Sequence, residues 1–269
     1  MSGFSATWLA LREPADHAAR DAGLARAAAG VLARQETARV LDIGCGTGSN
    51  LRGFAPWVAG RQCWTLVDHD AALLDAGRAL RGSLIASGTV SANVTVDFRQ
   101  VDLTQDHDQL LAPPCDLVTA AAFFDLVSEH WLRQFCAALA ARRLPLYAVL
   151  TYDGIEQWLP SHPLDARILA AFHRHQAGDK GFGAAAGPQA HGLLRDCLVE
   201  HGYHVTQAAS PWQLNAAHRT LMEQLAQGIA AAAQATGQVS AAEAETWQLA
   251  RTAAHACSIG HMDLLAVPA

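Results

Sequence analysis

Short apolar runs alternate with longer amphipathic segments along most of the chain. Apolar runs that end in turn-forming residues occupy 39–43, 63–67 and 94–98, and in the segments between them apolar residues recur every three or four positions. Runs of four to eight residues favour strands, whereas the wider spacing favours helices. Strands that alternate with helices predict an α/β protein with a doubly wound, mostly parallel sheet.

The same alternation continues through the second half of the chain. Further strands are expected at 116–119, 144–151, 203–208 and 261–267, and a helix is expected at 192–201. The fifth strand, 144–151, is expected to open into a loop at Tyr152. These runs bring the expected sheet to seven strands.

Three segments do not belong to this alternation. The N-terminal arm, 1–37, is expected to hold one helix with Pro14 in its first turn, and residues 214–257 are expected to form a helical hairpin between the last two strands. A second insertion is expected at about 157–187. Because ligands bind at the carboxyl edge of doubly wound sheets, we expect both insertions to cap a ligand pocket within a single domain, 1–269.

The most informative segment is a glycine-rich turn after the first strand. Asp42 is followed by Gly44, Gly46 and Gly48. Glycine permits positive φ angles and lets a ligand approach the backbone, and the helix that follows offers free N–H groups. The dinucleotide fingerprint would need its third small residue at Ser49, and the Gly-Lys-Ser/Thr of a phosphate loop is missing.

This turn resembles motif I of the class I S-adenosylmethionine-dependent methyltransferases, Asp/Glu-x-Gly-x-Gly-x-Gly. The resemblance implies a Rossmann-like methyltransferase fold, with the last strand antiparallel between the fifth and the sixth. It also implies that S-adenosyl-L-methionine is the cofactor. The residues that would bind it are Asp42, Gly44, Gly46, Gly48, Asn50, Asp68, His69, Asp102, Leu103 and Ala120.

Acidic residues also follow the second and third strands. Asp68 lies about 20 residues beyond the last glycine, where a carboxylate can accept both ribose hydroxyls. Asp70 suits the N-cap of the next helix. By resemblance, Asp102 would accept a hydrogen bond from the adenine amino group and the N–H of Leu103 would meet a ring nitrogen; alternatively, Asp102 is an ordinary loop acid.

Methyl transfer from a sulfonium needs mainly alignment of the two reactants, and a general base is needed only when the acceptor is protonated. The acceptor-side candidates are Tyr152 and Asp153, where the fifth strand ends, and His175 and Lys180 in the polar segment 172–183. A histidine could take a proton and a lysine could hold a carboxylate. The alternatives are simple strand termination and a solvated loop.

Composition and charge indicate which classes of partner the protein has. The formal charge is −6, and the longest run of Lys and Arg is two residues, which disfavours nucleic acid. No apolar run approaches the roughly 20 residues that span a bilayer, and no signal peptide is evident. The six cysteines lack metal-finger spacing. We therefore expect a cytoplasmic protein without a metal, either monomeric or homodimeric.

The segment after the fourth strand, Ala120-Ala-Ala-Phe-Phe124, departs from the Asn/Asp-Pro-Pro-Tyr/Phe of enzymes that methylate nucleic-acid bases. Asp125 stands where many small-molecule members have a histidine, and we transfer no role to it. The segments 210–212 and 260–263 resemble those of a bacterial subgroup of the family. The sequence thus predicts O- or N-methylation of a small polar metabolite. The alternatives are a protein or RNA methyltransferase and a non-catalytic module that binds the cofactor.

Overall fold

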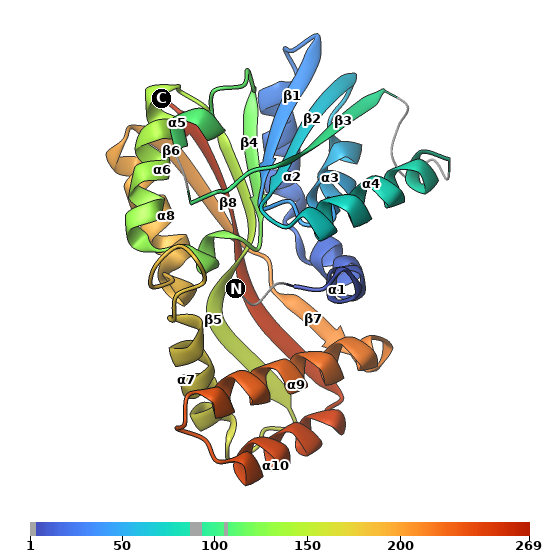
Figure 1. Cartoon of the computed structure of the whole chain (residues 1–269), viewed down its shortest axis with the longest axis vertical. Helices are drawn as coiled ribbons and strands as arrows, with labels where there is room; N and C mark the ends of the chain where they lie inside the picture. The colour runs from blue at the N-terminus through green and yellow to red at the C-terminus, as the bar shows by residue number, and fades with distance from the viewer. Residues whose placement is uncertain (1–3, 87–92, 105–106) are drawn as a thin grey trace.

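A computed structural model describes residues 4–86, 93–104 and 107–269 (Figure 1). Within these residues one sheet of eight strands has the order β3-β2-β1-β4-β5-β8-β6, and β7 pairs with β8 off this path. Strands β1 to β5 are parallel, whereas β8 is antiparallel to its neighbours β5 and β6. The expected mostly parallel α/β sheet is confirmed, as is the antiparallel last strand. The strands are β1 Thr37–Ile43, β2 Arg61–Asp68, β3 Val94–Gln100, β4 Leu117–Ala121, β5 Leu146–Leu159, β6 Tyr203–Ala209, β7 Trp212–Asn215 and β8 Ala256–Pro268.

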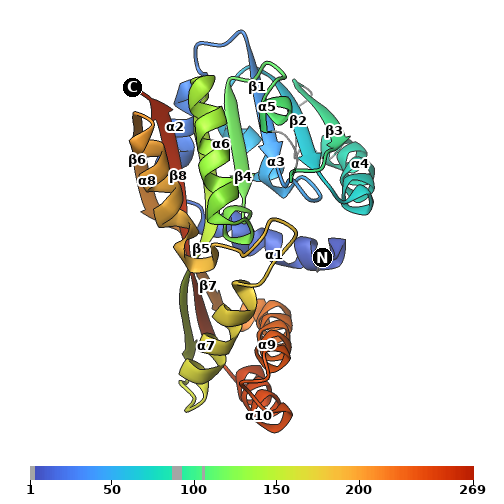
Figure 2. The same ribbon diagram turned by 60° about the vertical axis from the view of Figure 1, so that its left-hand side comes forward.

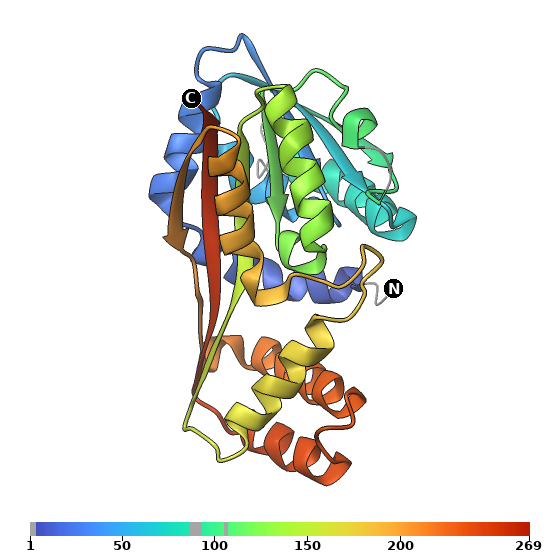
Figure 3. The ribbon, with the colours of Figure 1, turned by 90° about the vertical axis from the view of Figure 1, so that its left-hand side faces the viewer.

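Helices cover both faces of this sheet. One apolar core lies between the sheet and α2, α3 and α4, and the other lies between the sheet and α5, α6 and α8. Figure 3 shows α6 and α8 side by side on their face. Among the described residues, no helix combines the length and apolar character needed to cross a bilayer. The helices are α1 Ala6–Ala19, α2 Ala22–Leu32, α3 Ser49–Phe54, α4 Ala71–Ala86, α5 His107–Leu110, α6 Glu129–Ala141, α7 Asp165–Gln176, α8 Ala190–Glu200, α9 Arg219–Ala235 and α10 Ala241–Thr252.

Strands β5 and β8 continue beyond the main sheet and carry a second group of elements (Figure 2). We call α7, α9, α10, β7 and the adjoining ends of β5 and β8 the helical lobe. Its apolar core includes Trp158, Leu221, Met222 and Trp247, and is separate from the two cores of the main sheet. Helix α1 lies between the sheet and the helical lobe. Helix α7 falls within the expected insertion 157–187, and α9 and α10 fall within 214–257.

The N-terminal arm differs from the expected single helix. Two helices form because each has its own cap: Ser5 Oγ accepts from the N–H of Trp8 at 3.1 Å, and Asp21 Oδ1 accepts from that of Leu24 at 2.7 Å. Pro14 therefore lies inside α1 instead of in its first turn.

The fifth strand is longer than expected, and one strand escaped prediction. β5 does not end at Thr151, because Gly154 takes a positive φ of 88° and the register against β8 shifts there, so that pairing resumes at Glu156. In β7 the buried Trp212 and Leu214 alternate with exposed residues. This alternation covers only four residues, so the sequence alone does not distinguish it from the helical segment that follows. The sheet therefore has eight strands instead of seven.

Candidate functional site

The glycine-rich turn after β1 is closely packed on two sides. Gly44, Gly46 and Gly48 have φ angles of 63°, 53° and 82°, which residues with a Cβ rarely adopt. A Cβ at Gly44 would lie 2.5 Å from the Phe123 ring, and one at Gly46 would lie 3.0 Å from a methyl group of Leu9. The turn thus forms a cradle that side chains would fill, as expected where backbone must approach a ligand.

Asp68 joins the end of β2 to this turn. Its Oδ2 accepts a hydrogen bond from the N–H of Gly46 at 2.8 Å, and its Oδ1 accepts one from the N–H of Asp70 at 3.0 Å. The residue is 6% exposed. Each carboxylate oxygen has two lone pairs, so both oxygens can accept a further hydrogen bond. The predicted ribose-binding carboxylate therefore lies against the predicted glycine cradle.

Asp42 lies fully buried beneath the turn. Its Oδ1 accepts from Asn50 Nδ2 at 2.7 Å and from Thr119 Oγ1 at 2.8 Å. Burial raises the pKa of Asp42 to about 6 in spite of these hydrogen bonds. Asn50 in turn accepts from Arg20 Nη1 at 2.8 Å. Asp42 and Asn50 therefore fasten β1 to α3, and Arg20, which sequence reasoning missed, completes the network.

The two residues expected near the adenine lie after β3. Asp102 Oδ1 accepts from the N–H and hydroxyl of Thr104 at 2.9 and 2.7 Å, and so shapes an exposed turn. Leu103 is 2% exposed, and its carbonyl accepts from Trp131 Nε1 at 2.7 Å. These contacts fix the position of the loop, while the adenine contacts themselves stay a prediction.

The remaining predicted residues of the cofactor side lie at strand ends. His69 is partly exposed, and its Nδ1 is 3.3 Å from Asp68 Oδ1. Ala120 is buried in β4, next to β1. Asp70 caps α4 as expected, since its Oδ1 accepts from the N–H of Ala72 at 2.8 Å.

Helix α1 is held over the glycine turn by side-chain contacts to α3. Arg52 Nε donates to Glu13 at 2.6 Å, and His17 Nε2 is 3.0 Å from the carbonyl oxygen of Ser49. Glycine at position 53 makes this approach possible, because a Cβ there would lie 2.8 Å from the His17 ring. Helix α1 therefore forms one wall beside the cradle.

Tyr152 is the centre of a second group of polar side chains, beyond the carboxyl edge of the sheet. Its hydroxyl donates to Glu156 Oε1 at 2.9 Å and lies 3.0 Å from His173 Nε2. Because the single phenol proton is directed to Glu156, His173 donates its Nε2–H to the phenol oxygen. Burial raises the pKa of Tyr152, raises that of Glu156 to about 7 and lowers that of His173.

More titratable groups lie near Tyr152. Asp125 Oδ1 is buried and has no hydrogen-bond partner among the described residues, and burial raises the pKa of this carboxyl to about 6. The ring of His261 is centred 6.2 Å from that of Tyr152, and burial lowers its pKa to about 3. From α1, Arg12 pairs with Asp16 at 2.9 Å. Of these, the sequence offered a local signal only for Arg12 and Asp16, whose four-residue spacing favours an ion pair on a helix.

The predicted acceptor-side residues do not form one cluster. Lys180 Nζ donates to the carbonyl of His175 at 3.1 Å, while Asp153 Oδ1 accepts from the N–H of Ile155 at 2.9 Å and closes a local turn. Burial lowers the pKa of His175. The histidine that meets Tyr152 is His173, two residues earlier on α7. The roles predicted for His175, Tyr152, Asp153 and Lys180 stay predictions.

A cavity of about 660 Å³ opens beside His173. It lies between the start of α6, the end of α7 and the short helix η3 (Gly187–Gln189), and Ser128, Pro188 and Gln189 help to line it. The segment before η3 reaches back to the glycine turn, because the Phe182 ring packs edge-on against Phe123 with centroids 5.8 Å apart. The cavity is large enough for a small organic molecule.

Comparison with known proteins finds a match to the part of the chain that contains the predicted cofactor site. The family model of the methyltransferase domain matches residues 40–143, which run from β1 to just beyond α6. This range contains the glycine turn, Asp68, Asp102 and the whole segment 120–124 after β4. No curated protein matches the sequence significantly.

Solved structures support the same fold at low sequence identity. The cyclopropane synthase MmaA2 from Mycobacterium tuberculosis is 13% identical, with a TM-score of 0.53 over 98% of this chain and 94% of that protein. The YcgJ protein from Bacillus subtilis is 11% identical, with a TM-score of 0.50 over 91% of this chain and 98% of that protein. The match over residues 40–143 therefore identifies an S-adenosylmethionine-dependent methyltransferase domain that contains the cradle and Asp68, and the solved structures add the shared fold.

Proposed function

We propose that this methyltransferase transfers the methyl group of S-adenosylmethionine to an oxygen or nitrogen of a small polar metabolite, which binds beside Tyr152. The observation that carries the proposal is the grouping of Tyr152, His173 and Asp125 beyond the carboxyl edge of the sheet. Asp125 lies two residues after Phe123, whose ring packs against Gly44 of the cofactor cradle. Buried polar groups of this kind suit a polar acceptor better than an apolar one.

The residues of the proposed acceptor site have separate tasks. S-adenosylmethionine supplies an activated methyl group, so the protein has to align the acceptor and exclude water. The Tyr152 hydroxyl is oriented by Glu156, and its oxygen is held by His173. Burial lowers the pKa of His173, so it is neutral near pH 7 and its second ring nitrogen can accept a proton from a hydroxyl or ammonium acceptor.

The proposal also includes roles for the other predicted acceptor-side residues, for the cap and for the location of the protein in the cell. His175 and Lys180 would act from the end of α7, and Asp153 from β5. The helical lobe and the segment 177–187 would cap the acceptor. We also place the protein in the cytoplasm, where its six free cysteines would stay reduced.

The test is to incubate the protein with S-adenosylmethionine labelled in its methyl group and a metabolite extract, followed by mass spectrometry. A labelled small molecule that forms with the wild type, and not with Asp68→Asn, is the expected result. Label in protein or RNA would favour the macromolecular alternative. Binding of the cofactor without a labelled product in any fraction would favour a non-catalytic module.

A further inference from the structure

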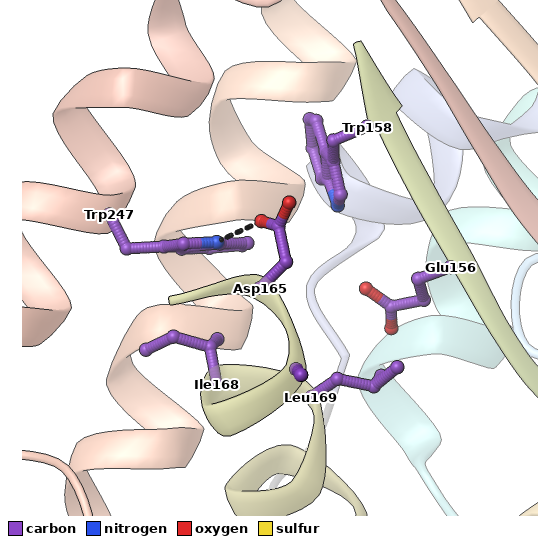
Figure 4. Close-up of a pocket in the computed structure, with 7 residues that line it drawn as sticks. Glu156, Trp158, Asp165, Ile168, Leu169 and Trp247 are labelled. Carbon is purple, nitrogen blue, oxygen red and sulfur yellow. Dashed lines mark hydrogen bonds between the residues drawn. The ribbon is translucent and has the colours of Figure 1, made fainter. Parts of the chain in front are cut away.

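A second cavity, of about 270 Å³, lies inside the helical lobe and is distinct from the cofactor cradle (Figure 4). We call it the lobe cavity. Residues from β5, α7 and α10 line it: Glu156, Trp158, Asp165, Ala166, Ile168, Leu169 and Trp247.

Polar groups converge on this space, and one of them, the indole N–H of Trp158, is left without a regular hydrogen bond to a described residue. Trp158 is 5% exposed, and its Nε1–H makes no hydrogen bond of regular geometry with any described residue. Figure 4 shows it directed toward the gap between Asp165 and Glu156, and its dipole lowers the pKa of Glu156 against the effect of burial. A buried donor without a good partner is destabilising. A molecule in the cavity that offers an oxygen would remove this cost.

The two carboxylates of the cavity differ in their partners. Asp165 Oδ1 accepts from Trp247 Nε1 at 2.7 Å and lies 3.6 Å from Arg251 Nη1. The Arg251 guanidinium also lies over the ring of Trp158, 5.8 Å from its centroid. One cation therefore already faces Asp165.

Glu156 has no such cation. Its Oε1 accepts from Tyr152, and it forms no ion pair with any described residue. Figure 4 shows its carboxylate directed into the cavity from β5. With Asp165 and Arg251 compensating each other, the charge left in the cavity above about pH 7 is that of the ionised Glu156. A buried carboxylate is strongly stabilised by a cation that also donates hydrogen bonds.

We propose that the lobe cavity binds a small organic amine with a hydroxyl or carbonyl oxygen near its nitrogen, with the ammonium group on Glu156 and the oxygen on the Trp158 indole. Ile168, Leu169 and the Trp247 ring would pack against its carbon skeleton. The side chain of Asp165 is 30% exposed and Ala166 is exposed, so the cavity has an opening on the α7 side. The lobe cavity is a different space from the proposed acceptor site, but the two share Glu156, whose Oε1 accepts from the Tyr152 hydroxyl.

Calorimetric titration with two probes of similar shape tests this site. The probes are 2-amino-1-phenylethanol and 1-phenylethanol, which lacks the amine. The expected result is saturable binding of the amine with one site per chain, and no measurable binding of the alcohol. Equal binding of both compounds, or binding of neither, would overturn the proposal.

Variants then locate the bound amine. Glu156→Gln keeps an acceptor for Tyr152 but removes the charge, and should weaken amine binding about 10- to 100-fold. Trp158→Phe keeps an aromatic ring without the donor, and should weaken it about 3- to 10-fold. The exposed Glu245 on α10 supplies the control, Glu245→Gln, which should bind like the wild type.

Thermal melting of each variant shows whether it is folded. Cofactor titration of the same variants shows whether the cofactor site is intact, so that a loss of amine binding can be distinguished from a damaged cofactor site. Unchanged amine affinity in a folded Glu156→Gln protein would contradict the assignment.

Discussion

The Asp68 carboxylate accepts a hydrogen bond from the backbone N–H of Gly46 at 2.8 Å, across 22 residues of sequence. The contact ties the carboxyl end of β2 to the middle of the glycine turn after β1. Two features that the sequence presents separately are therefore one structural unit, and a change in either should affect cofactor binding.

Replacing Gly46 tests the cradle. Gly46→Val should abolish cofactor binding, because φ is +53° and the added atoms would meet Leu9. The cost of left-handed backbone for a residue with a Cβ, about 1–2 kcal/mol, should also lower the free energy of unfolding.

The control is Gly60→Ala, at the start of β2. Gly60 also has a positive φ, +78°, but a Cβ there would meet no atom of the described residues within 4 Å. Urea unfolding should show a loss of about 1 kcal/mol in this control, while calorimetry should show unchanged cofactor binding. Cofactor binding by Gly46→Val would refute the cradle.

The Tyr152 hydroxyl should matter for turnover and not for cofactor affinity. Tyr152→Phe removes the hydrogen bonds to Glu156 and His173, and should slow formation of the labelled product about 10- to 100-fold. Tyr203→Phe is the matched control. Tyr203 lies in β6, away from the proposed acceptor site, and its hydroxyl donates to the carbonyl of Leu144. If both variants turned over equally, Tyr152 would have no acceptor role.

We predict that His175 contributes to turnover and not to cofactor binding. His175→Ala should reduce turnover while the calorimetric cofactor affinity stays at the wild-type value, because the residue lies at the end of α7 and outside the cradle. The exposed His204 on β6 provides the comparison, His204→Ala. Wild-type turnover in His175→Ala would make His175 a solvated helix-end residue.

Glu156 should make stability depend on pH. Burial raises its pKa from 4.5 to about 7, so between these values the folded state holds a proton that the unfolded state has released. The contribution of Glu156 to stability therefore falls as pH rises through this window, by up to about 3 kcal/mol.

Glu156→Gln lacks this titration. Urea unfolding should show the variant gaining stability relative to the wild type from pH 4.5 to 7, with a constant difference above pH 8. Glu245→Gln should follow the wild-type curve throughout. Parallel curves for Glu156→Gln and the wild type would rule out the raised pKa.

The sheet and the glycine turn were predictable because their signals are local. Strand β1 and the positive φ of Gly44, Gly46 and Gly48 follow from an apolar run and three glycines in one short segment. The cap formed by Asp70 likewise depends on residues within one helical turn.

Long-range contacts explain what the sequence did not reveal. The length of β5 depends on its pairing with β8, which is about 100 residues away in the chain, and β7 exists only as a partner of β8. The contact between Tyr152 and His173 depends on how α7 folds back along β5, so the sequence could not distinguish His173 from His175.

The most direct test is calorimetric titration of the intact protein with S-adenosylmethionine and with its product S-adenosylhomocysteine. Binding of each at one site, with a dissociation constant of micromolar order, is expected. Asp68→Asn should weaken binding at least about tenfold, because an amide cannot accept from the ribose with both of its terminal atoms. Asp70→Asn, which keeps a helix cap, should bind normally. If neither compound bound the folded wild-type protein, the assignment of S-adenosylmethionine as its cofactor would be contradicted.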